Sequence, residues 1–159
     1  MNYYFTDNEI AELISENKVL SKTLKEILTF KEADGHKKAS FEIEYEDGNQ
    51  FVIILRQNIN NINDFSAILA FQEKGKNTFF KLRRYNGKSH EHTNKLEGNK
   101  FYDFHIHYAT ARYQDVGWKE ESYAEITDRY SDIQTALNCL LKDCNIEILQ
   151  NPQTELFKN

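Results

Sequence analysis

The sequence predicts an α+β domain, with an N-terminal helical segment, a mainly antiparallel sheet of about five or six strands, and a C-terminal helix packed on one face. Apolar residues recur at helical spacing near both ends of the chain, whereas they alternate with polar residues in the middle. Asparagine and glycine separate the alternating segments. We expect residues 1–150 to form this single domain and residues 151–159 to be a C-terminal tail.

The N-terminal segment begins with a helix-start signal. Thr6-Asp7-Asn8-Glu9 has the form of a capping box, and apolar residues follow it at helical spacing, which predicts a helix from about Thr6 to Asn17. The same periodicity continues from Leu20 to Leu28. A second short helix, or a passage from helix to strand, should therefore fill residues 20–30.

The central segments have the alternation of β-strands. Residues 40–46 alternate between apolar and polar, and after Asp47-Gly48 comes the apolar run 51–55, which together predict a hairpin. Beyond an asparagine-rich loop at 58–63, strands are expected at 65–72, 78–85 and 101–108.

Asn86-Gly87 is a strong signal for a tight hairpin turn, because both central residues of a type I′ turn need positive φ. Lys88 to Thr93 should then fold back along Lys81 to Tyr85. This register sets Arg83 opposite His90 and Lys81 opposite His92.

The C-terminal segment predicts a second capped helix. Ser131-Asp132-Ile133-Gln134 has the capping-box form, and the residues after it form one apolar helical face that should cover the sheet. Cys144 lies on that face and is expected in the core, while Cys139 points roughly away from it and is a weak candidate for a metal ligand. Two cysteines five residues apart are too few for a disulfide framework.

The composition narrows the class of protein. The net charge of −5 argues against a general nucleic-acid binder, because such proteins neutralise phosphates with a basic surface. No apolar run approaches the roughly 20 residues that span a bilayer, so no membrane segment is expected. The first residues lack the basic and apolar regions of a signal peptide, and we expect a cytoplasmic protein.

Four of the five histidines lie in two His-x-His pairs, His90-Glu91-His92 and His105-Ile106-His107. Residues two apart share a face of a strand, so each pair can offer two imidazoles to one ligand. In the second pair the other face carries the apolar residues, and Asp103 aligns with the histidines. The pattern predicts a zinc site, with ligands from the following set: His90, His92, Asp103, His105 and His107.

The predicted neighbours of the first pair support a different chemistry. Arg83 and Lys81 would repel a divalent cation but suit a phosphate, and histidine can move protons near neutral pH. A metal-independent endoribonuclease would use His90 or His105 as acid or base and Arg83 to hold phosphate, with RNA contacts from Lys81, Arg83 and Lys88. A third interpretation is a binding module in which the histidines are merely exposed and have no chemical role. Because these interpretations differ, the sequence leaves open whether the protein is an enzyme.

Residues 115–132 combine carboxylates and aromatic residues without regular periodicity, which predicts a long loop. Together with Glu42, Glu44 and Glu46 on one strand face, this loop could form a surface for a basic partner. The leading hypothesis is therefore a zinc protein that acts by protein-protein interaction on a basic nucleic-acid-handling protein.

Two resemblances add expectations. The stretch Arg84-Tyr85-Asn86-Gly87-Lys88-Ser89-His90-Glu91-His92, followed by a second His-x-His strand and a late helix, resembles the TumE-type toxin family, which implies a nuclease or toxin role. An acidic chain rich in Asn, Lys and Ile is similar in overall character to small phage-encoded anti-CRISPR inhibitors. That likeness implies inhibition of a CRISPR effector, with the metal bracing a small fold.

Overall fold

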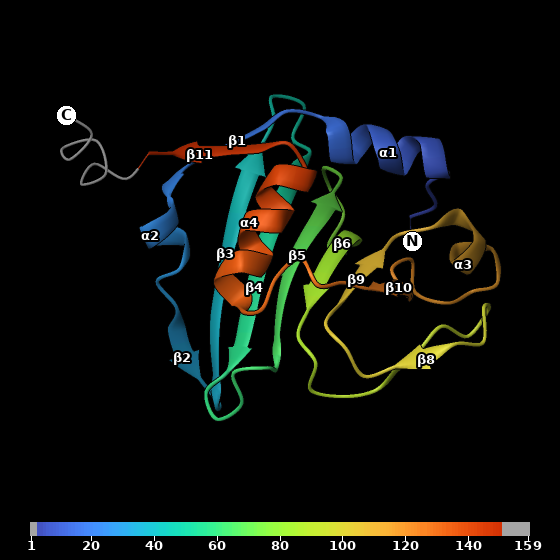
Figure 1. The fold of residues 1–159 in the computed structure, drawn as a ribbon. Coiled ribbons are helices and arrows are strands. Elements are labelled where there is room, and N and C mark those ends of the chain that lie inside the picture. The colour runs from blue at the N-terminus through green and yellow to red at the C-terminus, as the bar shows by residue number, and fades with distance from the viewer. Residues whose placement is uncertain (1–2, 151–159) are drawn as a thin grey trace.

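A seven-stranded antiparallel sheet forms the centre of the computed structural model, which describes residues 3–150. Helix α4 crosses one face of the sheet, so the predicted α+β class is confirmed (Figure 1). The predicted tail at 151–159 lies outside the described residues. In order across the sheet, the strands are β10 (Tyr123–Ile126), β9 (His105–Tyr108), β6 (Phe80–Asn86), β5 (Phe65–Gln72), β4 (Gln50–Asn58), β3 (His36–Glu44) and β2 (Lys31–Ala33).

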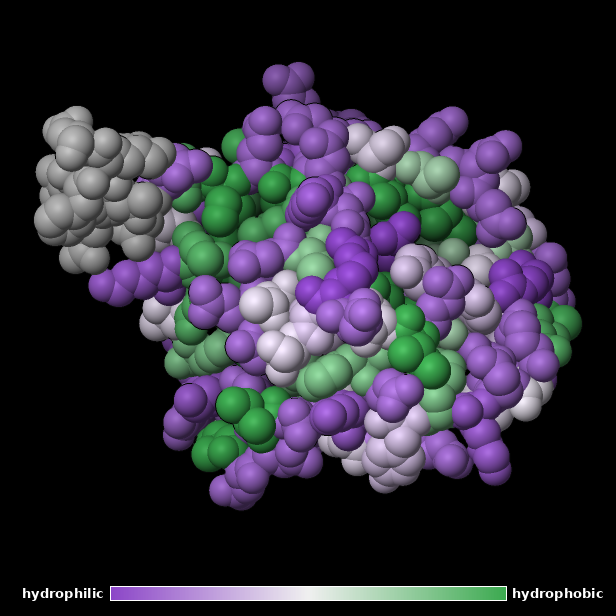
Figure 2. Space-filling view, in the orientation of Figure 1, coloured by the Kyte–Doolittle hydropathy of each residue, from purple (hydrophilic) through white to green (hydrophobic). Residues whose placement is uncertain are grey.

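The N-terminal helix α1 (Asp7–Ser15) starts at the predicted capping box, in which the Thr6 hydroxyl accepts a hydrogen bond from the Glu9 amide. Of the two alternatives for residues 20–30, the second short helix is present as α2 (Leu24–Ile27), and the strand β1 (Lys18–Thr23) precedes it rather than follows it. Strand β1 pairs in parallel with β11 (Ile146–Leu149), a pairing that the sequence did not predict. Figure 2 shows hydrophobic residues gathered over α2, β1 and β11.

Helix α4 (Ile133–Asp143) buries the apolar face that its spacing predicts, and Cys144 just beyond it is fully buried. Its cap is Asp132 rather than Ser131. The carboxylate of Asp132 accepts from the amide and hydroxyl of Thr135, and an aspartate caps as well as a serine does.

The chain does not turn back at Asn86-Gly87, so the predicted hairpin is wrong. Gly87 does not have positive φ; its amide donates to the Phe65 carbonyl, and an added Cβ would clash with the Asn63 carbonyl oxygen. Glycine is required here for close packing rather than for a tight turn. Strand β9 takes the place expected for residues 88–93.

A β-bulge in β6 decides which side chains face which way. Leu69 pairs with Arg83 and Ala70 with Lys81, so Leu82 is an extra residue on β6. Before the bulge Phe80 points into the core, where it packs on Phe5, and after it Tyr85 does, with its hydroxyl donating to Asp143 of α4. Arg84 and Asn86 are consequently turned to the opposite face.

Two further segments differ from the prediction. Residues 101–108 split into β8 (Lys100–Phe101), which pairs with β7 (His92–Thr93), and β9, which starts only at His105. The predicted loop at 115–132 begins at the end of helix α3 (Ala111–Asp115) and contains edge strand β10. Residues 3–150 contain no helix that is long and apolar enough to cross a membrane.

Lys18 is fully buried and joins the ends of two helices. Its ammonium donates to the carbonyls of Ile14, Glu16 and Cys144, each at 2.8 Å. Burial lowers its pKa to about 8. The last turns of α1 and α4 leave carbonyls without helical partners, and this one cation satisfies three such groups.

We predict that Lys18→Met lowers the free energy of unfolding by about 2 to 4 kcal/mol, because three carbonyls lose their donor. Urea unfolding followed by circular dichroism measures this change. Lys22→Met, on an exposed position of the same strand, is the matched control and should change stability by less than about 0.5 kcal/mol. Equal losses in the two variants would contradict a special role for Lys18.

Candidate metal site

Three histidines converge on the sheet face opposite α4. His105 and His107 come from β9, and His92 comes from β7, with one ligand nitrogen of each within 4.8 Å of the others. The ring of His92 lies 5.4 Å from that of His105 and 4.8 Å from that of His107, measured between centroids. Within residues 3–150 this is the one group of three or more His, Cys, Asp or Glu side chains spaced for a shared metal ion.

Each imidazole has its tautomer fixed by a carbonyl oxygen. Nδ1 of His105 lies 2.8 Å from the Asp103 main-chain oxygen, and Nδ1 of His107 lies 2.8 Å from that of Glu121. Nε2 of His92 lies 2.8 Å from the Asn94 side-chain oxygen. Since a carbonyl oxygen only accepts, these nitrogens carry the hydrogens, which leaves a lone pair on Nε2 of His105 and His107 and on Nδ1 of His92. The lone pair of His105 faces Nδ2 of Asn86, which lies 3.5 Å from its Nε2.

Asn94 sets the position of His92 although sequence reasoning gave it no role. Its side chain is fully buried; Oδ1 accepts from the Ala124 amide at 2.9 Å, and Nδ2 donates to the Ala124 carbonyl at 2.8 Å. These two bonds fix which amide atom faces His92. The only signal in the sequence is its spacing of two residues from His92.

Burial keeps two of the imidazoles neutral. It lowers the pKa of His105 to about 4, and it lowers that of His107 to about 2 with help from the nearby His105 and Arg84. A neutral imidazole is the form that binds a metal. At neutral pH neither ring in the metal-free protein has a proton on its free nitrogen to give to a substrate.

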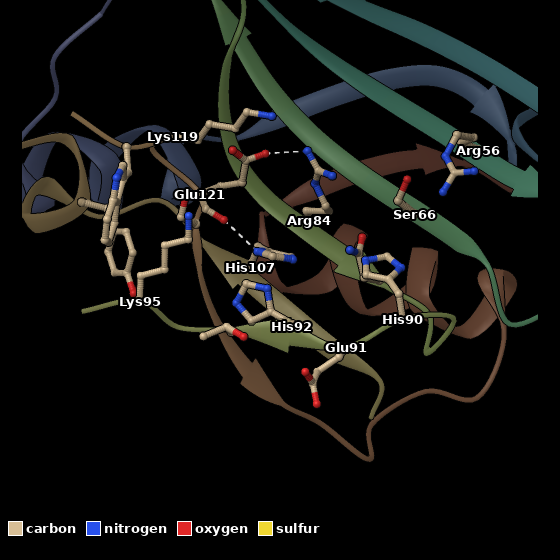
Figure 3. Close-up of a pocket in the computed structure, with 15 residues that line it drawn as sticks. Arg56, Ser66, Arg84, His90, Glu91, His92, Lys95, His107, Lys119 and Glu121 are labelled. Carbon is tan, nitrogen blue, oxygen red and sulfur yellow. Dashed lines mark hydrogen bonds and ion pairs between the residues drawn. The ribbon is translucent and has the colours of Figure 1, made fainter. Parts of the chain in front are cut away.

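The structure brings together three of the five ligands that the sequence predicted. His90 is exposed, its Nδ1 lies 3.1 Å from the Ser89 hydroxyl, and it stands apart from the cluster (Figure 3). Asp103 is also exposed and contributes only its main-chain oxygen, to His105. Both residues precede the strands that hold their neighbours, so strand alternation does not align them with the cluster.

A pocket of about 510 Å³ opens beside the cluster and is lined by His92 and His107. Arg84 lies across from His107 on the neighbouring strand and forms an ion pair of 2.6 Å with the buried carboxylate of Glu121 (Figure 3). Four basic side chains and two carboxylates line this pocket, namely Arg56, Arg84, Lys95, Lys119, Glu91 and Glu121.

The basic residues expected beside the histidines lie elsewhere. Arg83 faces α4, with its guanidinium over the Tyr108 ring and its Nη1 3.4 Å from the Tyr85 hydroxyl. The Lys88 ammonium lies over the Phe104 ring, and Lys81 lines a second pocket, together with Glu120, rather than the one beside the histidines. Arg84, one residue beyond Arg83, is the arginine that the fold places at the histidines.

Other predicted features are also internal. Cys139 is partly buried with its thiol 3.7 Å from the Arg129 carbonyl, and it lies outside the histidine cluster. Within the acidic and aromatic segment at 115–132, Tyr130 and Glu121 are buried and Glu121 is ion-paired. These two residues form part of the structure of the sheet and the pocket rather than its outer surface.

We predict that the metal-free protein loses stability as the pH falls below about 6.5, where the unfolded histidines gain protons. The folded pKa values of about 4 for His105 and about 2 for His107 lie below that of the unfolded chain, so the loss continues down to about pH 4 for His105 and about pH 2 for His107. Each histidine should add up to about 1.4 kcal/mol per pH unit. Urea unfolding with a chelator present, at intervals from pH 7.5 to 5, measures the slope.

The control for this prediction is His90→Gln, an exposed histidine that should keep the wild-type slope. The double variant His105→Gln/His107→Gln should have a shallower slope over the same range. An unchanged slope in the double variant would contradict the assignment.

Comparison with known proteins adds no relative. No protein-family model matches the chain, and no curated protein or solved structure matches it. The resemblances to TumE-type toxins and to anti-CRISPR inhibitors therefore have no support from these comparisons.

Proposed function

We propose that this protein binds one divalent transition-metal ion, with zinc the best fit, through Nδ1 of His92 and Nε2 of His105 and His107. The observation that carries the proposal is the convergence of three imidazoles whose tautomers are already fixed by hydrogen bonds to carbonyl oxygens. Imidazole binds several transition metals. Zinc tolerates the widest range of ligand arrangements, because its filled d shell imposes no preferred coordination geometry.

The spacing supports this choice. Zinc-nitrogen bonds of about 2.0 to 2.1 Å in a tetrahedral site place the nitrogens roughly 3.3 Å apart. One nitrogen of each ring lies within 4.8 Å of the other two, so binding at those atoms would draw them together by at most roughly 1.5 Å. The second nitrogen of each ring donates a hydrogen bond to a carbonyl oxygen. Such bonds orient metal-binding histidines and raise the basicity of the ligand nitrogen.

The fourth coordination position would face the pocket. Structural zinc sites use four protein ligands, whereas sites that bind or activate small molecules use three and keep one position exchangeable. Cys144 lies in the core and Cys139 beside Arg129, so neither supplies a fourth ligand here. We therefore favour a ligand-binding or catalytic metal, acting as a Lewis acid, over a metal that only braces the fold.

Elemental analysis of protein purified without a histidine tag tests the metal. We expect about one zinc per chain in the wild type and loss of stoichiometric zinc in His92→Ala. His90→Ala, two residues earlier in the chain, is the matched control and should retain the metal. Wild-type protein that binds no zinc after incubation and desalting, or zinc content unaffected by His92→Ala, would overturn the proposal.

A second experiment tests how the ligands are held. We predict that Asn94→Leu weakens zinc binding by about 10- to 100-fold, because the His92 ring loses the carbonyl that orients it. Competition with a chromophoric chelator measures the affinity, and circular dichroism confirms that the variant is folded. Asn99→Leu, which removes a bond to Asn94 but not to His92, is the control and should retain most of the affinity. Wild-type affinity in folded Asn94→Leu would contradict the assignment.

A further inference from the structure

The wall of the pocket continues from the histidines across the sheet. In register, His107 lies opposite Arg84, and His105 lies opposite Asn86. The next strand places Ser66 beside Asn86, and Arg56 follows it on β4. The cross-strand pairs thus form a continuous polar wall that starts at the metal ligands and leads away from them.

Two buried atoms on this wall have no hydrogen-bond partner among the described residues: Nε of Arg84, a donor, and Oδ1 of Asn86, an acceptor. Buried polar atoms in folded proteins nearly always have partners, and one without a partner calls for an explanation. A molecule in the pocket that supplied an acceptor to Arg84 and a donor to Asn86 would satisfy both.

The charge of the pocket selects an anion. Four basic side chains outnumber two carboxylates, and a divalent cation at the histidines would add to this excess. The Arg84 guanidinium is three-quarters buried and held by Glu121, so it is already oriented for a ligand.

The far side of the pocket is aromatic. Trp118 is partly exposed, packs 5.8 Å from the Tyr113 ring, and lines the pocket with it. The volume of about 510 Å³ lies in the range that holds small organic ligands and exceeds what one inorganic anion fills.

We propose that this pocket binds a phosphorylated small molecule, with one phosphate oxygen at the open position of the metal and another at Arg84. The proposal rests on the metal site proposed above. A phosphate has enough oxygens to reach both cations. Inorganic hydrogen phosphate also keeps one P–OH at neutral pH that can donate to Asn86 Oδ1, whereas a carboxylate offers no donor. The organic part of the ligand would lie toward Trp118.

The test uses inorganic phosphate as the probe on zinc-loaded protein, with zinc content measured on every sample. Isothermal titration calorimetry should show phosphate binding to the wild type. The double variant Arg84→Gln/Glu121→Gln removes the arginine without leaving a buried unpaired carboxylate, and it should bind phosphate at least about tenfold more weakly. The matched control is Arg129→Gln/Asp143→Asn, which removes an arginine-carboxylate pair on the α4 side and should bind phosphate as the wild type does.

Sulfate provides a matched ligand, because it has the same shape but no proton to donate at neutral pH. We expect sulfate to bind about tenfold more weakly than phosphate. In protein loaded with Co²⁺ in place of zinc, phosphate should change the visible absorption, since an oxygen enters the coordination shell of the metal.

The outcomes separate the two proposals. Full zinc content with no phosphate binding, or with equal binding by the Arg84 double variant, overturns the phosphate assignment and leaves the metal site intact. Phosphate binding without a change in the cobalt spectrum overturns the contact to the metal, and equal affinity for sulfate overturns the donor to Asn86. A wild type that takes up no zinc overturns the metal site and the bridging geometry together.

Discussion

Ile106 determines where the histidine site can form, because its burial fixes which face of β9 its neighbours occupy. Its side chain lies in the core beneath α4, and strand alternation then places His105 and His107 on the opposite face. A shift of β9 by one residue would exchange the two sets and bury imidazoles under the helix. Strands β6 and β10 pair with β9 on both sides and hold this register. The same packing that stabilises the sheet therefore orients the metal ligands.

Much of the fold follows from local patterns in the sequence. The capping box at Thr6, the hairpin of β3 and β4, and the apolar face of α4 each depend on residues close together in the chain. The parallel pairing of β1 with β11 joins segments from opposite ends of the chain, and no local pattern encodes it. Gly87 led to a wrong prediction because glycine is found both in tight turns and at close contacts between main chains. Here it permits a close approach to Asn63, whereas the sequence suggested a turn.

The site could be predicted where strand alternation applied. His105, Ile106 and His107 lie within β9, and the expected split between faces is confirmed. His90 and Asp103 lie before their strands begin, so the pattern did not extend to them. Arg84 could not be chosen over Arg83, since the bulge at Leu82 that reverses the alternation leaves no mark on the local sequence. Asn94 was beyond prediction because its partner, Ala124, is 30 residues away.

The side chain of Asn94 has a consequence for how this protein behaves in solution. Strand β10 lies at the edge of the sheet, where unpaired main-chain groups can recruit a strand from another molecule and so lead to aggregation. The Asn94 amide bonds to both the N–H and the C=O of Ala124, so it occupies this edge much as a neighbouring strand would. The opposite edge, β2, is only three residues long and fully exposed, and it carries Lys31 and Glu32. The residue that orients His92 thus also covers the main chain of Ala124 at this edge of the sheet.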